Sequence, residues 1–125
     1  MSEFCATAIP LCESDDLQEG GLALGFDVVY AGQTARAFAI RYKGVPHAYL
    51  NRCTHVPVEL DSREGEILDD SGQWLMCSMH GAVYAPDSGV CLGGPCRGGL
   101  VKIVVSETAG KVHWHTAPYL QSVEF

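Results

Sequence analysis

The sequence predicts an all-β fold, an antiparallel β-sandwich, on three observations. Short apolar segments recur at hairpin-length spacing, with turns such as 31–34 and 43–44 between them. The segment 36–42 alternates, so that Arg36, Phe38, Ile40 and Tyr42 share one face and Ala37, Ala39 and Arg41 the other. No internal repeat or long helical pattern is visible. The length of 125 residues leaves room for a single domain, residues 1–125.

Turn residues bound each expected strand. A polar turn at 15–21 precedes the first strand, and Asp69-Asp70-Ser71-Gly72 is a strong turn signal inside a hairpin. Residues 86–89 form another turn by composition, and Ala109-Gly110 turns the final hairpin. No assignment is evident for residues 116–125. In chain order, the expected strands are residues 23–30, 36–42, 45–50, 67–68, 74–76, 83–85, 100–105 and 112–115.

Composition and charge exclude several classes of protein. Apolar residues make up 47% of the chain and charged residues 18%, which favours a packed core over disorder. The formal charge of −7 disfavours nucleic acid and anionic membranes as partners. No apolar run is long enough to cross a membrane, and no signal peptide is evident, so a cytoplasmic location is expected. The acidic charge suits a partner with a basic docking patch, or serves ordinary solubility.

Two short motifs carry the chemistry. Cys53-Thr54-His55 and Cys77-Ser78-Met79-His80 each pair one thiol with one imidazole. Two such loops can hold a [2Fe-2S] cluster, with both thiolates on one iron and both imidazoles on the other. A zinc site could also use two Cys and two His, although zinc motifs usually group the cysteines in one half and the histidines in the other.

These motifs resemble the two ligand loops of Rieske proteins. The resemblance rests on residues 51–55 and 77–82, on 89–95, which resembles the proline-bearing loop over the cluster, and on 11–17, which resembles the family's opening. It extends from about Ile9 to Trp114, and the nearest kind is the small, free-standing Rieske ferredoxin of bacterial oxygenases. It implies a Rieske-like sandwich with a cluster-binding subdomain at about residues 51–98. The implied cofactor is one [2Fe-2S] cluster on Cys53, His55, Cys77 and His80.

The resemblance also implies a function. Such proteins pass single electrons, here from a flavin-dependent reductase to a terminal oxygenase, and they carry no catalytic residues of their own. The spare histidines His47, His113 and His115 are therefore interpreted as surface or core residues. Two alternatives stay open: a Rieske-like small subunit of a reductase such as assimilatory nitrite reductase, and a zinc-stabilised interaction domain.

Departures from the high-potential members of the family predict a low potential. Val58 and Met79 stand where those proteins have a pair of disulfide-forming cysteines. Ala82 stands where they have a serine that donates to a cluster sulfide. Tyr84 keeps the position of a tyrosine that donates to a cysteine sulfur. Fewer donors leave the reduced cluster less stabilised.

Other polar features leave their roles open. Cys5, Cys12, Cys91 and Cys96 are expected to stay thiols in a reducing compartment. Small packing residues are one interpretation of Cys91 and Cys96, and a redox pair or alternative ligand is the other. The acidic linker at 59–70 is either a solvated hairpin or part of a docking face.

Overall fold

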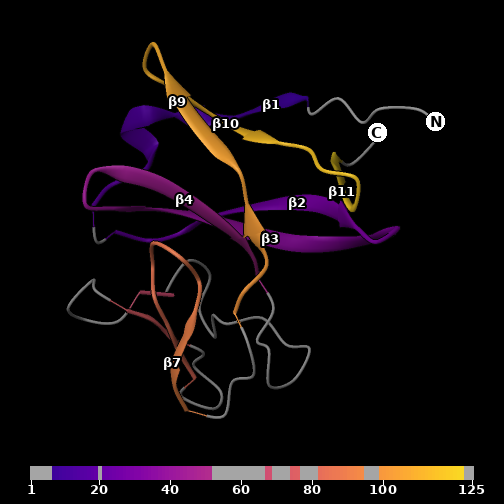
Figure 1. Cartoon of the computed structure of the whole chain (residues 1–125). Coiled ribbons are helices and arrows are strands. Elements are labelled where there is room, and N and C mark those ends of the chain that lie inside the picture. Colours follow the sequence, from indigo (N-terminus) through magenta and orange to yellow (C-terminus); the bar gives the residue numbers. More distant parts are fainter. Residues whose placement is uncertain are drawn as a thin grey trace.

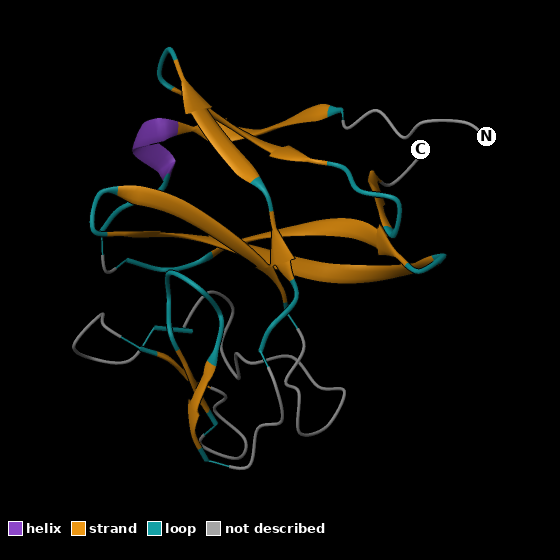
Figure 2. Ribbon diagram, in the orientation of Figure 1, coloured by secondary structure: helices purple, strands orange, loops and turns teal. Residues whose placement is uncertain are grey.

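The computed structural model describes residues 7–19, 21–51, 67–68, 74–76, 82–94 and 99–122. Within these ranges the chain is built of strands, with one short 3-10 turn, η1, at Ser14–Asp16 (Figures 1 and 2). No helix among the described residues is long and apolar enough to cross a membrane. The strands are β1 (Ala8–Glu13), β2 (Leu24–Tyr30), β3 (Gln33–Tyr42), β4 (Val45–Leu50), β5 (Leu75–Met76), β6 (Val83–Tyr84), β7 (Cys91–Gly93), β8 (Lys102–Ile103), β9 (Val105–Thr108), β10 (Lys111–His115) and β11 (Leu120–Ser122).

The strands form three antiparallel sheets. Sheet A has the order β1-β10-β9, sheet B the order β11-β2-β3-β4-β8, and sheet C the order β5-β6-β7. Sheet B lies in the middle, with sheet A on one side and sheet C on the other (Figure 1). The prediction of an all-β antiparallel fold is confirmed.

One apolar cluster fills the space between sheets A and B. The centre of sheet B contributes three fully buried alanines, Ala37, Ala39 and Ala48, beside larger buried residues of the same sheet. Large residues oppose them, including Trp114 of β10, whose ring lies 5.8 Å from that of Phe26. Small side chains on one layer let large ones on the other interdigitate at native packing density.

A second apolar cluster joins sheets B and C. Here the opposite face of sheet B contributes large side chains: Phe38, Ile40 and Tyr49. Leu75, Ala82 and Tyr84 come from the sheet C side, and all three are fully buried. The predicted alternation of residues 37–40 is confirmed, because β3 packs one side chain into each cluster in turn.

Three two-residue turns close the hairpins of sheets A and B. Each has a positive φ at both central residues: Ala31-Gly32, Lys43-Gly44 and Ala109-Gly110. This geometry is that of type I′ turns, whose twist matches that of the flanking strands. All three turns were predicted from composition. The turn expected at 69–72 lies outside the described residues, although its two flanks do pair, Leu68 with Leu75.

The structure corrects the predicted strands in several ways. The expected strand at 100–105 is two strands, because the chain passes from sheet B to sheet A around Val104, which is 64% exposed. β1, β7 and β11 were not predicted at all. β3 also begins three residues earlier than expected, at Gln33.

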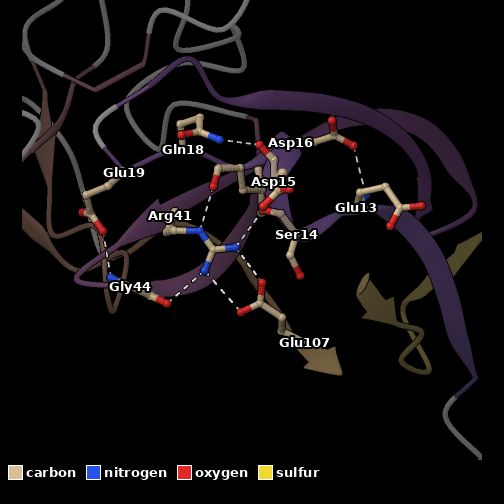
Figure 3. Close-up of polar contacts among 10 residues, drawn as sticks. Glu13, Ser14, Asp15, Asp16, Gln18, Glu19, Arg41, Gly44 and Glu107 are labelled. Carbon is tan, nitrogen blue, oxygen red and sulfur yellow. Dashed lines mark hydrogen bonds and ion pairs between the residues drawn. The ribbon is translucent and has the colours of Figure 1, made fainter. Parts of the chain in front are cut away.

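Arg41 ties three segments together at the end of β3 (Figure 3). Its Nε donates to the carbonyl of Leu17 at 2.7 Å, its Nη2 to that of Ser14 at 3.0 Å, and its Nη1 to that of Gly44 at 2.9 Å. The two terminal nitrogens also bind the Glu107 carboxylate, at 3.2 and 2.6 Å. This hydrogen bonding holds the pKa of Glu107 below its ordinary value. The planar guanidinium of Arg41 has five N–H donors and can bind all these acceptors at once, whereas a lysine ammonium has only three.

Candidate metal centre

The four predicted ligands, Cys53, His55, Cys77 and His80, lie outside the described residues. What the structure shows is the frame that delivers the chain to and from their motifs. β4 ends at Leu50, β5 ends one residue before Cys77, and β6 begins three residues after His80. Among the described residues, no group of three or more His, Cys, Asp or Glu side chains could hold a metal ion.

Sheet C fixes both ends of the second motif. Met76 and Val83 are paired partners in the antiparallel β5–β6 ladder, and so are Leu75 and Tyr84. Met76 is also held from outside the ladder, because its amide donates to the carbonyl of Ile67 at 2.9 Å. The chain therefore leaves the sheet and returns to it at adjacent positions, as a loop needs to do if it presents ligands.

Sheet B and its neighbours fix the entry to the first motif. The Leu50 amide donates to the carbonyl of Val101, and the Asn51 amide to that of Arg36, both at 2.9 Å. Leu50 itself is 2% exposed. The last described residues before Cys53 are thus hydrogen-bonded on both sides of β4.

A tight turn at residues 85–90 contacts the chain before and after residues 91–98, the segment that contains Pro95 and is called the proline-bearing stretch below. The Gly89 amide donates to the carbonyl of Ala85 at 2.7 Å, and the Ala85 amide to that of Val90 at 3.0 Å. The Gly89 carbonyl accepts from the amide of Leu100 at 2.8 Å. Gly89 has a φ of +75°, which glycine adopts without strain. β7 begins directly after this turn, and Leu100 lies just beyond the proline-bearing stretch. The turn is therefore connected to the chain at both ends of that stretch.

Tyr49 connects this turn to sheet B. The residue is fully buried in β4, and its hydroxyl donates to the carbonyl of Pro86 at 2.7 Å. Its ring packs on Gly89, where an added Cβ would lie 2.8 Å from Cε1. Burial raises the pKa of Tyr49, so the hydroxyl stays protonated and able to donate. Sequence analysis did not identify this residue.

The three spare histidines lie in separate surroundings. His47 of β4 is half-buried beside Tyr42, and burial lowers its pKa, with a further contribution from Lys102. His115 Nε2 lies 2.8 Å from Ser106 Oγ. His113 lines a small surface hollow beside Cys12. All three are half-buried in strands of the sandwich.

The expectation that all remaining cysteines are thiols is wrong for Cys91. Cys91 is disulfide-bonded, to a partner outside the described residues. The prediction used the redox compartment alone, whereas a disulfide also depends on which cysteines the fold brings within bonding distance. Cys12 is a free thiol packed against the A–B core, and burial raises its pKa, with a contribution from Asp16. Cys5 and Cys96 lie outside the described residues.

Ala82 and Tyr84 follow the second motif directly. Both are fully buried in the cluster between sheets B and C. A methyl group cannot donate a hydrogen bond, so position 82 offers only its backbone to whatever lies beside it.

Comparison with known proteins agrees with this frame. No curated protein sequence matches the chain, but the profile of the Rieske [2Fe-2S] domain matches residues 7–108. The ferredoxin of carbazole 1,9a-dioxygenase from Nocardioides aromaticivorans IC177 is 19% identical, with a TM-score of 0.69 over 86% of this chain and 96% of that one. A Sphingomonas yanoikuyae B1 ferredoxin is 20% identical, with a TM-score of 0.68 over 89% of this chain and 100% of that one. The family profile covers most of the sequence, and the chain therefore belongs to the Rieske [2Fe-2S] domain family.

Proposed function

We propose that this protein is a one-electron carrier whose [2Fe-2S] cluster is held by Cys53 and Cys77 on one iron and by His55 and His80 on the other. The observation that carries the proposal is the frame of β4, β5 and β6, whose ends lead directly into both motifs inside the family match. The donor set fits the group, because thiolates and imidazoles are the ligands of this cluster type. When bound, the cluster accepts and returns one electron at a time.

The protein's own residues define the surroundings of this group. Sheet C holds both ends of the second motif, and the 85–90 turn supports the proline-bearing stretch. Ala82 supplies no side-chain donor, which supports a low reduction potential. We further propose that residues 1–125 form one domain, with the cluster-binding part at about 51–98.

The proposed partners are proteins. Solved structures similar to this chain include a complex of reduced oxygenase and oxidised ferredoxin in carbazole 1,9a-dioxygenase, 22% identical with a TM-score of 0.65 over 86% of this chain and 91% of that one. This likeness supports a terminal oxygenase as electron acceptor. We propose a flavin-dependent reductase as the electron donor and the cytoplasm as the location. The charge of −7 favours a basic docking patch on the acceptor. Electron transfer to it should then slow as salt rises, and a rate indifferent to ionic strength contradicts this electrostatic part.

Cluster content tests the central claim. Purified protein should contain two iron atoms and two acid-labile sulfides per chain, and dithionite-reduced protein should give a Rieske-type EPR signal. Cys53→Ala should abolish both, while Cys12→Ala should leave them unchanged, because Cys12 lies in the A–B core, away from sheet C. Stoichiometric zinc without acid-labile sulfide in the wild-type protein would overturn the proposal.

A further inference from the structure

Tyr49 makes a contact that joins the sandwich to the layer next to the cluster motifs. Its ring belongs to β4 in sheet B, and it packs beside Phe38 with the ring centroids 5.8 Å apart. Its hydroxyl reaches across to the Pro86 carbonyl, in the turn between β6 and β7 of sheet C. Residues 49 and 86 are thus a long-range pair that spans the two layers.

The contact is specific in both shape and polarity. Pro86 and Gly89 are both buried, and the missing side chain of Gly89 lets the tyrosine ring approach the turn. The Pro86 carbonyl has no backbone partner among the described hydrogen bonds, so the Tyr49 hydroxyl satisfies it. A buried carbonyl left without a donor is costly, which makes this placement of the turn strongly preferred.

A second tether reinforces the same turn from sheet B. Lys102 of β8 pairs with Tyr49 in the ladder, and its Nζ donates to the carbonyl of Asp87 at 3.1 Å. Gly99 packs against the turn from the other side, where an added Cβ would lie 2.9 Å from the Gly89 carbonyl oxygen. Residues 85–90 are therefore held by two paired residues of sheet B, Tyr49 and Lys102, and by the segment Gly99-Leu100 that precedes β8.

We infer that Tyr49 is a positioning residue for the cluster, acting through the 85–90 turn. Its hydroxyl holds the turn that leads into β7 and that accepts the Leu100 amide, so it acts on the described chain on both sides of the stretch that contains Pro95. The inference rests on the proposed function. It goes beyond it by assigning control of the cluster's surroundings to a residue in the body of the sandwich.

Tyr49→Phe tests the inference, because it keeps the ring and removes only the hydroxyl. Hydrogen–deuterium exchange of the holoprotein should quicken about 2- to 10-fold at the amides of Gly89 and Leu100, and stay unchanged in β1 and β10. Iron release to a chelator should quicken by a similar factor, and the EPR signal of the reduced cluster should broaden or shift. Tyr119→Phe is the matched control, since Tyr119 is 49% exposed at the far end of sheet B beside Tyr30.

Each outcome decides a separate point. Faster exchange with an unchanged EPR signal and unchanged reduction potential would make Tyr49 structural only, and would overturn the inference. Unchanged exchange would overturn it as well, since the turn would not depend on the hydroxyl. Wild-type protein without iron and sulfide would defeat the proposed function and the role toward the cluster together, while the exchange data would still report whether Tyr49 holds the turn.

Discussion

Replacing Arg41 by methionine should destabilise the protein far more than removing an ordinary surface charge. The guanidinium makes five hydrogen bonds of 2.6–3.2 Å, three of them to backbone carbonyls of η1, its flank and the β3–β4 turn. Its side chain is 15% exposed and that of Glu107 27%, so water replaces these bonds only in part. Bonds to charged groups are worth about 1.5–3 kcal/mol each but are not additive. We expect a loss of about 2–4 kcal/mol, between the values for surface and buried ion pairs.

The assay is thermal unfolding of the holoprotein followed by circular dichroism. For a chain of this length the loss corresponds to a fall in Tm of about 8–15 °C. Lys111→Met is the matched control, because the Lys111–Glu13 pair is also short, at 2.9 Å, yet both side chains are 61% exposed. It should cost less than about 0.5 kcal/mol. A loss for Arg41→Met no larger than that of the control would show that water replaces the guanidinium without cost, which would refute the reasoning.

Three further predictions concern single groups. The pKa of Glu107 is lower in the folded protein than the ordinary carboxyl value of 4.5. Its contribution to the free energy of unfolding is therefore fully present above pH 4.5 and is lost as the pH falls through the folded-state pKa. Glu107→Gln should thus be less stable than wild type at pH 7, and the difference should shrink in acid. Gly89→Ala should lower the free energy of unfolding in urea by about 2–4 kcal/mol, because alanine is strained at a positive φ and its Cβ would clash with Tyr49. Gly110 also has a positive φ, of +78°, but no atom lies within 4 Å of an added Cβ. Gly110→Ala should therefore cost only the backbone strain, about 1–2 kcal/mol. Ala82→Ser should raise the reduction potential by some tens of millivolts in voltammetry if it restores a donor to the cluster, and an unchanged potential would mean that position 82 does not face it.

The sequence predicted those parts of the fold that depend on local signals. The alternation around Phe38 and Ile40 follows from a period of two, and the turns at Ala31-Gly32 and Lys43-Gly44 follow from residues that tolerate positive φ. β1 was missed because its residues show little alternation, and its partner β10 lies about a hundred residues away. β11 was missed because three residues hold too little pattern. Both strands owe their existence to pairing with distant segments, which short-range patterns do not report.

In the candidate site, too, local motifs could be predicted and long-range contacts could not. Its ligands were predicted because two loops that each pair a Cys with a His at short spacing are typical of one kind of cluster site. Tyr49 could not be predicted, because an isolated tyrosine in an apolar strand carries no sign of the carbonyl that it will meet 37 positions later. For Cys91 the sequence left a packing residue and a redox pair as alternatives, and it could not decide between them, since sequence order does not say which cysteines become neighbours.

β1 can pair with β10 only after almost the whole chain has been synthesised, because the two strands lie near opposite ends of the sequence. Ala8 pairs with His115, and Thr7 and Thr116 exchange two hydrogen bonds, at 2.9 and 3.0 Å. At about 5–20 residues per second, the ribosome needs about 5–20 s to make the chain between β1 and β10. Both cysteine–histidine motifs therefore emerge while β1 still has an unpaired edge and sheet A is incomplete. During that interval the newborn chain exposes the unpaired edge of β1, a site at which other chains can pair with it.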